Sequence, residues 1–267
     1  CSAKRRKIMP ELPEVEVTRI GLKPLLKKDI EKVVIRNYSL RWPINSGLPE
    51  LLKNQTLLDL SRRGKYILAK FNSGTLIIHL GMSGRLCIVS ADEVLNKHDH
   101  VDIQFKQNNL ILRYRDPRRF GSILWTEKDP YNHKLIKNLG PEPLNEEFDA
   151  KYLFSRLRNK QQCIKNAIMD SHMVVGVGNI YASEALYAAG IRPHRISKNV
   201  SMKEVSGLVK SIKNVIKEAI IKGGSTMNDF FDVNGENGYF QNEHKVYGRE
   251  NELCFECQLP IIQLRLG

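Results

Sequence analysis

The hydrophobic pattern changes its period once along the chain, and this change limits the folds that the chain can adopt. Between residues 32 and 126, apolar residues fall in short β-branched or alternating runs, which are typical of strands. These runs are 32–36, 66–71, 75–80, 101–105 and 110–114. After residues 139–143, which are dense in glycine and proline, the spacing becomes helical. We therefore predict a β domain followed by a helical domain, with the boundary between about residues 140 and 150.

Helical signals lie on both sides of the β region. Pro13, Glu14 and Glu16 resemble the first turn of a helix, which we expect to continue for about four turns. Beyond the boundary, residues 152–169 and 180–189 have helical spacing.

A longer amphipathic helix follows in the second half. Ser201 and Glu204 form a capping box, apolar residues then recur on one face, and Gly223 with Gly224 marks the stop. We expect this helix to pack in the core and to carry no chemistry.

The chain is strongly basic. Its 267 residues include 42 Lys and Arg against 29 Asp and Glu, which gives a net charge of +13 at pH 7. Residues 9–143 hold 22 basic and 15 acidic residues, whereas residues 144–267 hold 16 and 14. An excess of this size is typical of proteins that bind phosphate polymers or anionic surfaces.

Composition excludes several other classes of protein. With 42% hydrophobic and 27% charged residues, the chain is neither a disordered tail nor a collagen-like rod. Its apolar stretches are too short for a membrane span or a signal peptide. We expect a soluble intracellular protein without a membrane partner. The chain opens with Cys1, so Met9 is the first plausible translation start, and residues 1–8 are expected to be a non-native extension.

Five cysteines form an odd and scattered set, which argues against a disulfide framework and for a reducing compartment. Only Cys254 and Cys257 are close, at the two-residue spacing that lets two thiolates reach one tetrahedral zinc. A structural zinc takes four ligands, and neither Cys nor His occurs between Cys257 and Gly267. Spacing alone leaves a half zinc site, a redox pair and chance open.

A glycine-rich turn, residues 175–179, lies between two expected helices. Its glycines allow close approach of the backbone, and amides at the start of the second helix can hold a phosphate. Such a turn is often mere geometry, because neither a P-loop lysine nor a Rossmann strand precedes it. On a basic protein, Asn179 at the helix start favours a contact with a DNA backbone.

Two loops that follow predicted strands combine apolar and basic residues. One carries Met82 between glycines, and the other carries Arg118, Arg119 and Phe120. Proteins that open a duplex insert apolar side chains between base steps while arginine fills the vacated space. Alternatively, Met82 and Phe120 belong to the core and the arginines to a solvated rim. Two such loops in one basic domain favour the wedge.

Taken together, these motifs resemble those of bacterial formamidopyrimidine-DNA glycosylase, a bifunctional repair enzyme for oxidised purines. They occur in the order of that family and cover nearly the whole chain from Met9 onward. The sister branch of the endonuclease VIII type usually opens Pro-Glu-Gly-Pro-Glu, so Leu12 favours the formamidopyrimidine branch. The matching segments are PELPEVE from Pro10, SRRGKY from Ser61, HLGMSG from His79, KHDHVD from Lys97, DPRRFG from Asp116, LGPEPL from Leu139, VVGVGNIYASEALYAAGI from Val174, GGST from Gly223, GYFQ from Gly238 and VYGR from Val246.

The resemblance implies catalytic roles for three residues. Pro10 matches the nucleophile, which is a secondary amine once Met9 is removed. With a pKa near the α-amino reference, roughly a tenth of that amine is neutral at pH 7 and can attack C1′ of the damaged nucleotide. Glu11 matches the proton-transfer carboxylate, and Lys65 matches the lysine of β-elimination and phosphate contact.

The resemblance also implies DNA-contacting residues. Met82, Arg118 and Phe120 match the triad that fills the gap and probes the orphaned cytosine after the lesion is flipped out. His98, Arg118, Lys160 and Asn179 match DNA-contacting positions. Residues 223–230 resemble the loop that closes over the lesion.

The sequence departs from the family pattern at both ends. Eight residues precede Met9, and the tertiary amide that they leave at Pro10 has no nucleophilic lone pair. The family's second Cys pair, and an Arg that assists δ-elimination, would lie beyond Gly267. We expect this to reflect a fragment or partial gene record rather than a natural truncation.

The expected fold class is therefore α+β. It comprises a catalytic β-sandwich domain with flanking helices (9–143), a helical domain with a helix-two-turn-helix element (150–235) and an incomplete zinc β-hairpin (245–267). The expected function is excision of 8-oxoguanine and formamidopyrimidines from double-stranded DNA, followed by strand cleavage. The alternative is a catalytically impaired DNA-damage binding module. We expect a monomer in the bacterial cytoplasm, associated with the nucleoid, and one structural zinc per complete chain, held in part by Cys254 and Cys257.

Overall fold

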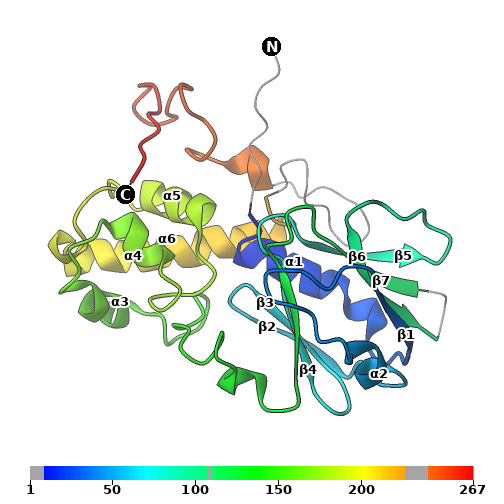
Figure 1. The fold of residues 1–267 in the computed structure, drawn as a ribbon. Helices are drawn as coiled ribbons and strands as arrows, with labels where there is room; N and C mark the ends of the chain where they lie inside the picture. The colour runs from blue at the N-terminus through cyan, green and yellow to red at the C-terminus, as the bar shows by residue number, and fades with distance from the viewer. Residues whose placement is uncertain (1–8, 107–109, 226–239, 267) are drawn as a thin grey trace. The chain divides into compact units, whose positions relative to one another are not determined.

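The described residues of the computed structural model are 9–106, 110–225 and 240–266, and they form two compact units (Figure 1). Among these residues, the first unit comprises 9–10, 14–137 and Ser225. The second comprises 11–13, 138–224 and 240–266. Over the described ranges, none of the helices combines the length and apolarity needed to cross a membrane.

Two antiparallel four-stranded sheets build the first unit. The first sheet has the order β1-β6-β7-β5, and the second has the order β2-β3-β4-β8. The strands are β1 (Ile30–Ile35), β2 (Asp59–Arg63), β3 (Tyr66–Lys70), β4 (Thr75–His79), β5 (Arg85–Ser90), β6 (Asp99–Phe105), β7 (Leu110–Arg115) and β8 (Ser122–Thr126). All four interior strands coincide with runs that the sequence predicts.

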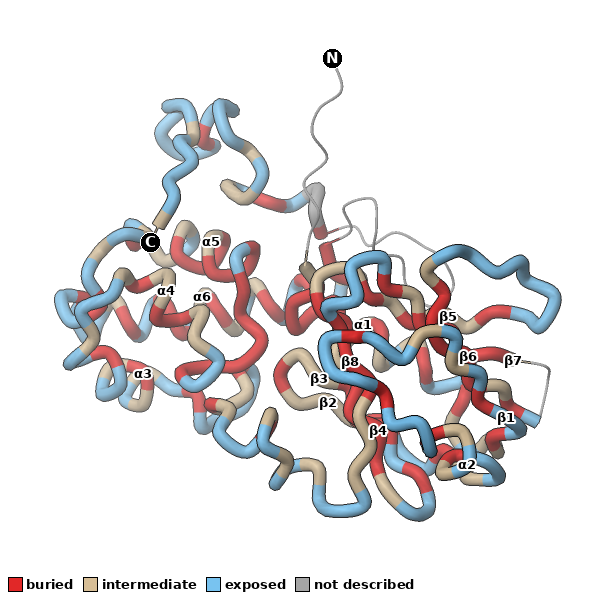
Figure 2. The backbone as a smooth tube through the Cα atoms, viewed as in Figure 1, coloured by how far each residue is buried: buried red, intermediate tan, exposed pale blue. Residues whose placement is uncertain are grey.

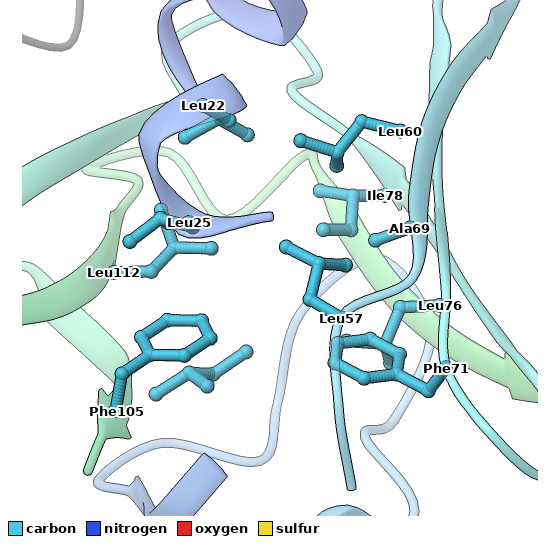
Figure 3. Close-up of a pocket in the computed structure, with 11 residues that line it drawn as sticks. Leu22, Leu25, Leu57, Leu60, Ala69, Phe71, Leu76, Ile78, Phe105 and Leu112 are labelled. Carbon is cyan, nitrogen blue, oxygen red and sulfur yellow. The ribbon is translucent and has the colours of Figure 1, made fainter. Parts of the chain in front are cut away.

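The two sheets enclose one hydrophobic core. Figure 3 shows Leu22, Leu25, Phe105 and Leu112 on one side facing the side chains of the second sheet, such as Ile78, on the other. The void that remains between them measures about 10 Å³. Packing at this density gives each sheet a fixed position within the unit, because either inner face would otherwise expose apolar surface to water.

The first helix is shorter than the sequence predicts. α1 (Leu12–Gly21) ends at a glycine, and a 3-10 turn (Lys23–Leu25) replaces the expected last turns. Pro24 explains the change, because it has no N–H to continue the α-helical hydrogen bonds. A second short helix, α2 (Leu48–Leu52), also belongs to the first unit.

The second unit is helical. Its helices are α3 (Ala150–Leu157), α4 (Ile164–Met169), α5 (Asn179–Ala188) and α6 (Met202–Ile221). The prediction of a single helix over 152–169 is wrong, because two separate helices, α3 and α4, occupy this range. The intervening backbone instead bonds to a distant segment: Ile164 N donates to Arg195 O at 2.8 Å, and Ser197 N donates to Gln162 O at 3.0 Å.

The α6 helix follows the sequence prediction closely. The Ser201 side chain accepts a hydrogen bond from Glu204 N, and the Glu204 side chain accepts one from Ser201 N. Gly223 and Gly224, with φ values of +77° and +82°, end the helix in a conformation that favours glycine. The remaining short 3-10 turns are Pro130–Asn132, Ser197–Asn199 and Phe240–Glu243.

Candidate active site

In the second unit, the carboxylate of Glu11 occupies the N-terminus of α5. It accepts hydrogen bonds from Gly178 N at 2.7 Å, Ile180 N at 2.9 Å and Tyr181 N at 3.4 Å. The residue is 1% exposed. The first amides of a helix lack intrahelical acceptors and lie at the positive end of its dipole, so they stabilise this buried anion.

This arrangement corrects the expectation that these amides hold a phosphate. The anion that they bind comes from the chain itself, 167 residues before Gly178. The side chain of Asn179 is exposed, so its expected DNA contact remains a prediction. Figure 2 shows that most of α5 is buried.

The glycines of the turn are needed for this approach. A Cβ on Gly178 would lie 2.4 Å from Glu11 Cδ, and one on Gly176 would lie 2.4 Å from Leu12 Cβ. Gly176 also has a φ of +81°, and its carbonyl accepts a hydrogen bond from Leu12 N at 3.1 Å. The turn is therefore shaped to fit residues 11 and 12 rather than an external ligand.

One lysine of the second unit lies close to Glu11. Lys165, which the sequence analysis did not single out, lies on α4 and is half-buried. Burial lowers the pKa of Lys165, and the nearby charge of Glu11 opposes that shift. Nothing in the amphipathic pattern of α4 distinguishes this lysine from a solvated one. The expected DNA-contacting residue Lys160 lies beyond α3 in the same unit and is half-buried.

A second buried carboxylate, which belongs to α5 itself, binds the backbone that precedes the cysteine pair. Glu184, 4% exposed, accepts hydrogen bonds from Lys245 N at 2.8 Å, Val246 N at 3.0 Å and Tyr247 N at 2.7 Å. One helix thus fixes both Glu11 and the start of the C-terminal segment.

The expected metal ligands lie in that C-terminal segment, which Figure 2 shows as mostly exposed. Cys254 is buried and Cys257 is exposed. Cys254 N donates to Leu259 O at 2.9 Å and Leu253 pairs with Pro260, which gives the segment the shape of a short hairpin. Within the described ranges, no group of three or more metal-ligating side chains occurs.

In the first unit, Lys65 lies in the two-residue turn between β2 and β3. Arg63 pairs with Tyr66, so Gly64 and Lys65 make the turn, and Gly64 has a φ of +56°. The side chain of Lys65 is partly buried. Pro10, the expected nucleophile, is also in this unit and is buried.

An ion-pair network attaches this turn to α1. Arg62 Nε donates to Glu16 Oε2 at 2.9 Å, and Arg62 Nη1 donates to Gly64 O at 2.9 Å. Arg19 binds the same carboxylate, with an N–O distance of 2.7 Å, and donates to Leu60 O at 3.0 Å. Glu16 therefore holds two arginines that bind backbone carbonyls near the two ends of β2: Leu60 O within the strand and Gly64 O just after it.

A pocket of about 620 Å³ opens on the first unit and brings together three of the expected DNA-contacting residues, Met82, Arg118 and Phe120. Phe120 is 46% exposed, and the Arg118 guanidinium lies 4.7 Å from the centre of its ring. These positions do not match a core role for Phe120. The other lining residues are Met9, Ser39, Leu40, Arg41, His79, Gly81 and Arg119.

The pocket contains a histidine that the sequence analysis did not assign. His79 ends β4, its Nδ1 accepts a hydrogen bond from Gly81 N at 3.0 Å, and its ring lies 4.8 Å from that of Tyr66. Burial, with the charges of Lys65 and Arg41, lowers the pKa of His79 to about 4. The imidazole is therefore neutral at pH 7. The expected contact residue His98 lies elsewhere in this unit and is half-buried.

Part of the expected site falls outside the described residues. The lesion-closing loop expected at 223–230 is described only as far as Ser225, whose N–H donates to Glu14 Oε1 at 2.8 Å.

Comparisons with known proteins identify the family. Residues 9–123 match the model of the formamidopyrimidine-DNA glycosylase N-terminal domain, and residues 139–230 match that of its H2TH domain. The formamidopyrimidine-DNA glycosylase of Methylobacillus flagellatus is 51% identical over 259 residues, which cover 97% of this chain and 92% of that protein. The protein of Saccharophagus degradans is 49% identical, with 97% and 96% covered.

The chain belongs to the formamidopyrimidine-DNA glycosylase family.

Solved structures of the family agree with the fold. The MutM (Fpg) protein of Thermus thermophilus superposes with a TM-score of 0.87 at 33% identity, covering 97% of this chain and 94% of that one. The Fpg of Lactococcus lactis in complex with abasic-site DNA gives 0.88 at 32% identity, with 96% and 95% covered. The predicted α+β fold, a β-sandwich domain followed by an H2TH helical domain, is confirmed.

A methyl group at Gly178 should displace the Glu11 carboxylate. We expect Gly178→Ala to destabilise this family member by about 1–3 kcal/mol, because the added Cβ overlaps a buried side chain. Gly207→Ala is the matched control: it lies within α6 with open space around it, and should stabilise by about 0.5–1 kcal/mol. Urea unfolding of both variants checks the prediction. Equal stability of Gly178→Ala and the parent chain would contradict it.

Stability should depend on pH through Glu16. Burial raises the pKa of this carboxyl, but hydrogen bonds and charges from Arg19 and Arg62 prevail and hold it below the ordinary value of 4.5. The network therefore stabilises the fold above pH 4.5, and this contribution is lost as the pH falls through the lowered pKa. Glu16→Gln should cost about 1–2 kcal/mol at pH 7, and the difference from the parent should shrink below pH 4.5.

The exposed Glu146 provides the control for this measurement. Glu146→Gln should leave the unfolding free energy unchanged at pH 7 and at pH 3. A difference between Glu16→Gln and the parent that stays constant from pH 7 to pH 3 would show that the ion pairs contribute nothing.

Proposed function

We propose that the chain is a bifunctional DNA glycosylase and abasic-site lyase that excises oxidised purines, 8-oxoguanine and formamidopyrimidines, from duplex DNA. The observation that carries this proposal is the fixed position of Glu11, directly after Pro10, in a chain that belongs to this family. Relatives named formamidopyrimidine-DNA glycosylase and the Lactococcus lactis Fpg structure with abasic-site DNA support the substrate class.

The reaction begins at the nitrogen of Pro10. When this nitrogen is a free secondary amine, its lone pair attacks C1′ of the damaged nucleotide, and the bond from C1′ to the base breaks. The base leaves with the proton of that amine. The C1′–O4′ bond of the sugar ring then breaks, O4′ takes a proton, and C1′ and the proline nitrogen form an iminium ion. Because Pro10 is followed by a residue held on three amides, the nucleophile lies on a restrained backbone.

Strand cleavage then follows from the iminium. As an electron sink, it labilises the C2′ proton, whose loss expels the 3′ phosphate by β-elimination. Loss of the C4′ proton from the conjugated iminium that results then expels the 5′ phosphate by δ-elimination. Water finally hydrolyses the adduct and restores the amine. Glu11, whose ionised form the α5 amides favour, accepts and returns protons in this sequence. Lys65 assists β-elimination and contacts phosphate.

The duplex must be opened before this chemistry. Met82, Arg118 and Phe120 take the place of the extruded nucleotide, and they line one pocket of the first unit. His98, Lys160 and Asn179 contact the DNA backbone, which suits a chain with a net charge of +13.

Borohydride trapping tests the proposal. A chain expressed from Met9 and processed to Pro10 is mixed with an 8-oxoguanine duplex, and reduction of the iminium is expected to give a covalent adduct at Pro10. The 267-residue chain is the control, because an amide at Pro10 cannot form the iminium. Binding without trapping by the processed chain would favour the DNA-damage binding module. Equal trapping of both chains would refute Pro10 as the nucleophile.

We also propose that Cys254 and Cys257 supply two of the four ligands of a structural zinc. Their spacing and the tight turn between them fit two thiolates on one metal ion. The ion would stabilise the hairpin and take no part in the reaction.

Counting ligands predicts a weak site in the 267-residue chain, because half the coordination shell is missing. A chain extended by a second Cys pair should bind one zinc tightly, and the same extended chain with Cys254→Ser should not. Titration with a colorimetric zinc chelator measures all three. Tight stoichiometric zinc in the 267-residue chain would show that the ligand count is wrong.

A further inference from the structure

Asp116 is a fully buried carboxylate that the proposed chemistry does not use. Its exposure is 0%. Oδ1 accepts hydrogen bonds from Ser83 Oγ at 2.6 Å and Arg118 N at 3.3 Å. Oδ2 accepts them from Gly121 N at 2.8 Å and Tyr114 OH at 3.2 Å. Four neutral donors therefore satisfy this anion, and they come from three different segments of the first unit.

Ser83 joins the two loops of the pocket. Besides donating to Asp116, its Oγ accepts a hydrogen bond from Arg118 N at 3.1 Å. The loops also touch directly, because a Cβ on Gly81 would lie 2.4 Å from the carbonyl carbon of Phe120. The loop that carries Met82 and the loop that carries Arg118 and Phe120 thus form one hydrogen-bonded body.

The backbone of Asp116 extends this body to a third segment. Its N–H donates to His98 O at 3.1 Å, and its carbonyl lies 2.8 Å from His100 Nε2. Asp116 therefore forms a hydrogen bond with the backbone of two expected DNA-contacting residues, Arg118 and His98. It also forms hydrogen bonds with Ser83 and Gly121, the chain neighbours of the other two, Met82 and Phe120.

The Arg118 side chain is left available by this arrangement. Its backbone N–H is bound, but its guanidinium lies over the Phe120 ring and, within the described residues, forms no salt bridge with Asp116. Asp116 therefore orients the loop without neutralising the charge that would meet DNA.

We propose that Asp116 and Ser83 are positioning residues that preassemble Met82, Arg118 and Phe120 into a rigid wedge. A wedge that is already ordered does not lose loop entropy when it enters the duplex, so extrusion of the damaged base is easier. This inference rests on the proposed function, because a wedge is needed only where a base is flipped out.

Ser83→Ala tests the proposal. It removes the one hydroxyl that binds both Asp116 and the backbone N–H of Arg118, and it alters no other hydrogen bond among the described residues. Ser90→Ala is the matched control, because the Ser90 hydroxyl also binds an aspartate, Asp92, but on an exposed loop. Ser83→Thr keeps the hydroxyl and should restore the behaviour of the parent chain.

The first readout is binding alone and uses the 267-residue chain. Duplex DNA carries a stable abasic analogue opposite 2-aminopurine, whose fluorescence rises when it loses stacking partners. The parent and Ser90→Ala should raise the signal, and Ser83→Ala at saturation should give a smaller rise. An equal rise for Ser83→Ala and the parent would overturn the proposal.

The second readout separates wedge insertion from chemistry and uses chains that begin at Pro10. Ser83→Ala should lower single-turnover excision of 8-oxoguanine from duplex DNA by about two- to tenfold, the effect of losing one or two hydrogen bonds. Cleavage of an abasic site in single-stranded DNA should change by less than about twofold, because no base is flipped.

An equal loss in both reactions would show a general structural defect and overturn the proposal. Absence of excision by the parent chain would instead refute the proposed function, and the fluorescence readout would still decide whether Ser83 orders the loops.

Discussion

The hydrogen bonds from the N-terminus of α5 to Glu11 are the interaction on which the proposed site depends. They attach the beginning of the chain to a helix that is 167 residues away in sequence. A carboxylate at this place needs amides without intrahelical acceptors, a turn without side chains at 176 and 178, and a helix that is itself well packed. The structure provides all three. Because the amide nitrogen of Glu11 is covalently bound to Pro10, fixing Glu11 also restrains the proposed nucleophile.

Edge strands explain what the sequence could and could not predict about the fold. Each interior strand, β3, β4, β6 and β7, has a continuous or alternating apolar run, since neighbours and the opposite sheet cover it. Of the edge strands, only β1 was predicted. The strands β2, β5 and β8 were missed. An edge strand tolerates charges such as Arg62 and Arg63 of β2, and these break the pattern of that strand. The strands β5 and β8 have no charge in their interior and are short apolar runs.

The candidate site shows a different limit. The prediction of Pro10, Glu11 and Lys65 as catalytic residues rests on motifs, because short strings of residue types carry that kind of information locally. The partners of these residues come from far along the chain, as with Glu11 and Gly178, and no local pattern contains them. The expectation that the amides at the start of α5 hold a phosphate was wrong for this reason: these amides do bind an anion, but the anion is the chain's own Glu11. His79 and Lys165 were missed because only the fold shows what surrounds them.

Some buried carboxylates bind arginine side chains, and others bind backbone amides and hydroxyls. This difference decides which arginines remain available to DNA. Asp102 binds Arg113 at 2.9 Å, and Asp99 binds Arg115, so these arginines are committed within the first sheet. Glu11, Glu184 and Asp116 are satisfied mainly by backbone amides and hydroxyls instead. An acid that binds amides shapes a loop without consuming a cation. Arg118 therefore remains on the pocket surface, stacked on Phe120 rather than neutralised by the aspartate that orients its loop. In a protein of net charge +13, this division leaves positive charge where a phosphate backbone can meet it, because the acids that organise the site are buried away from it.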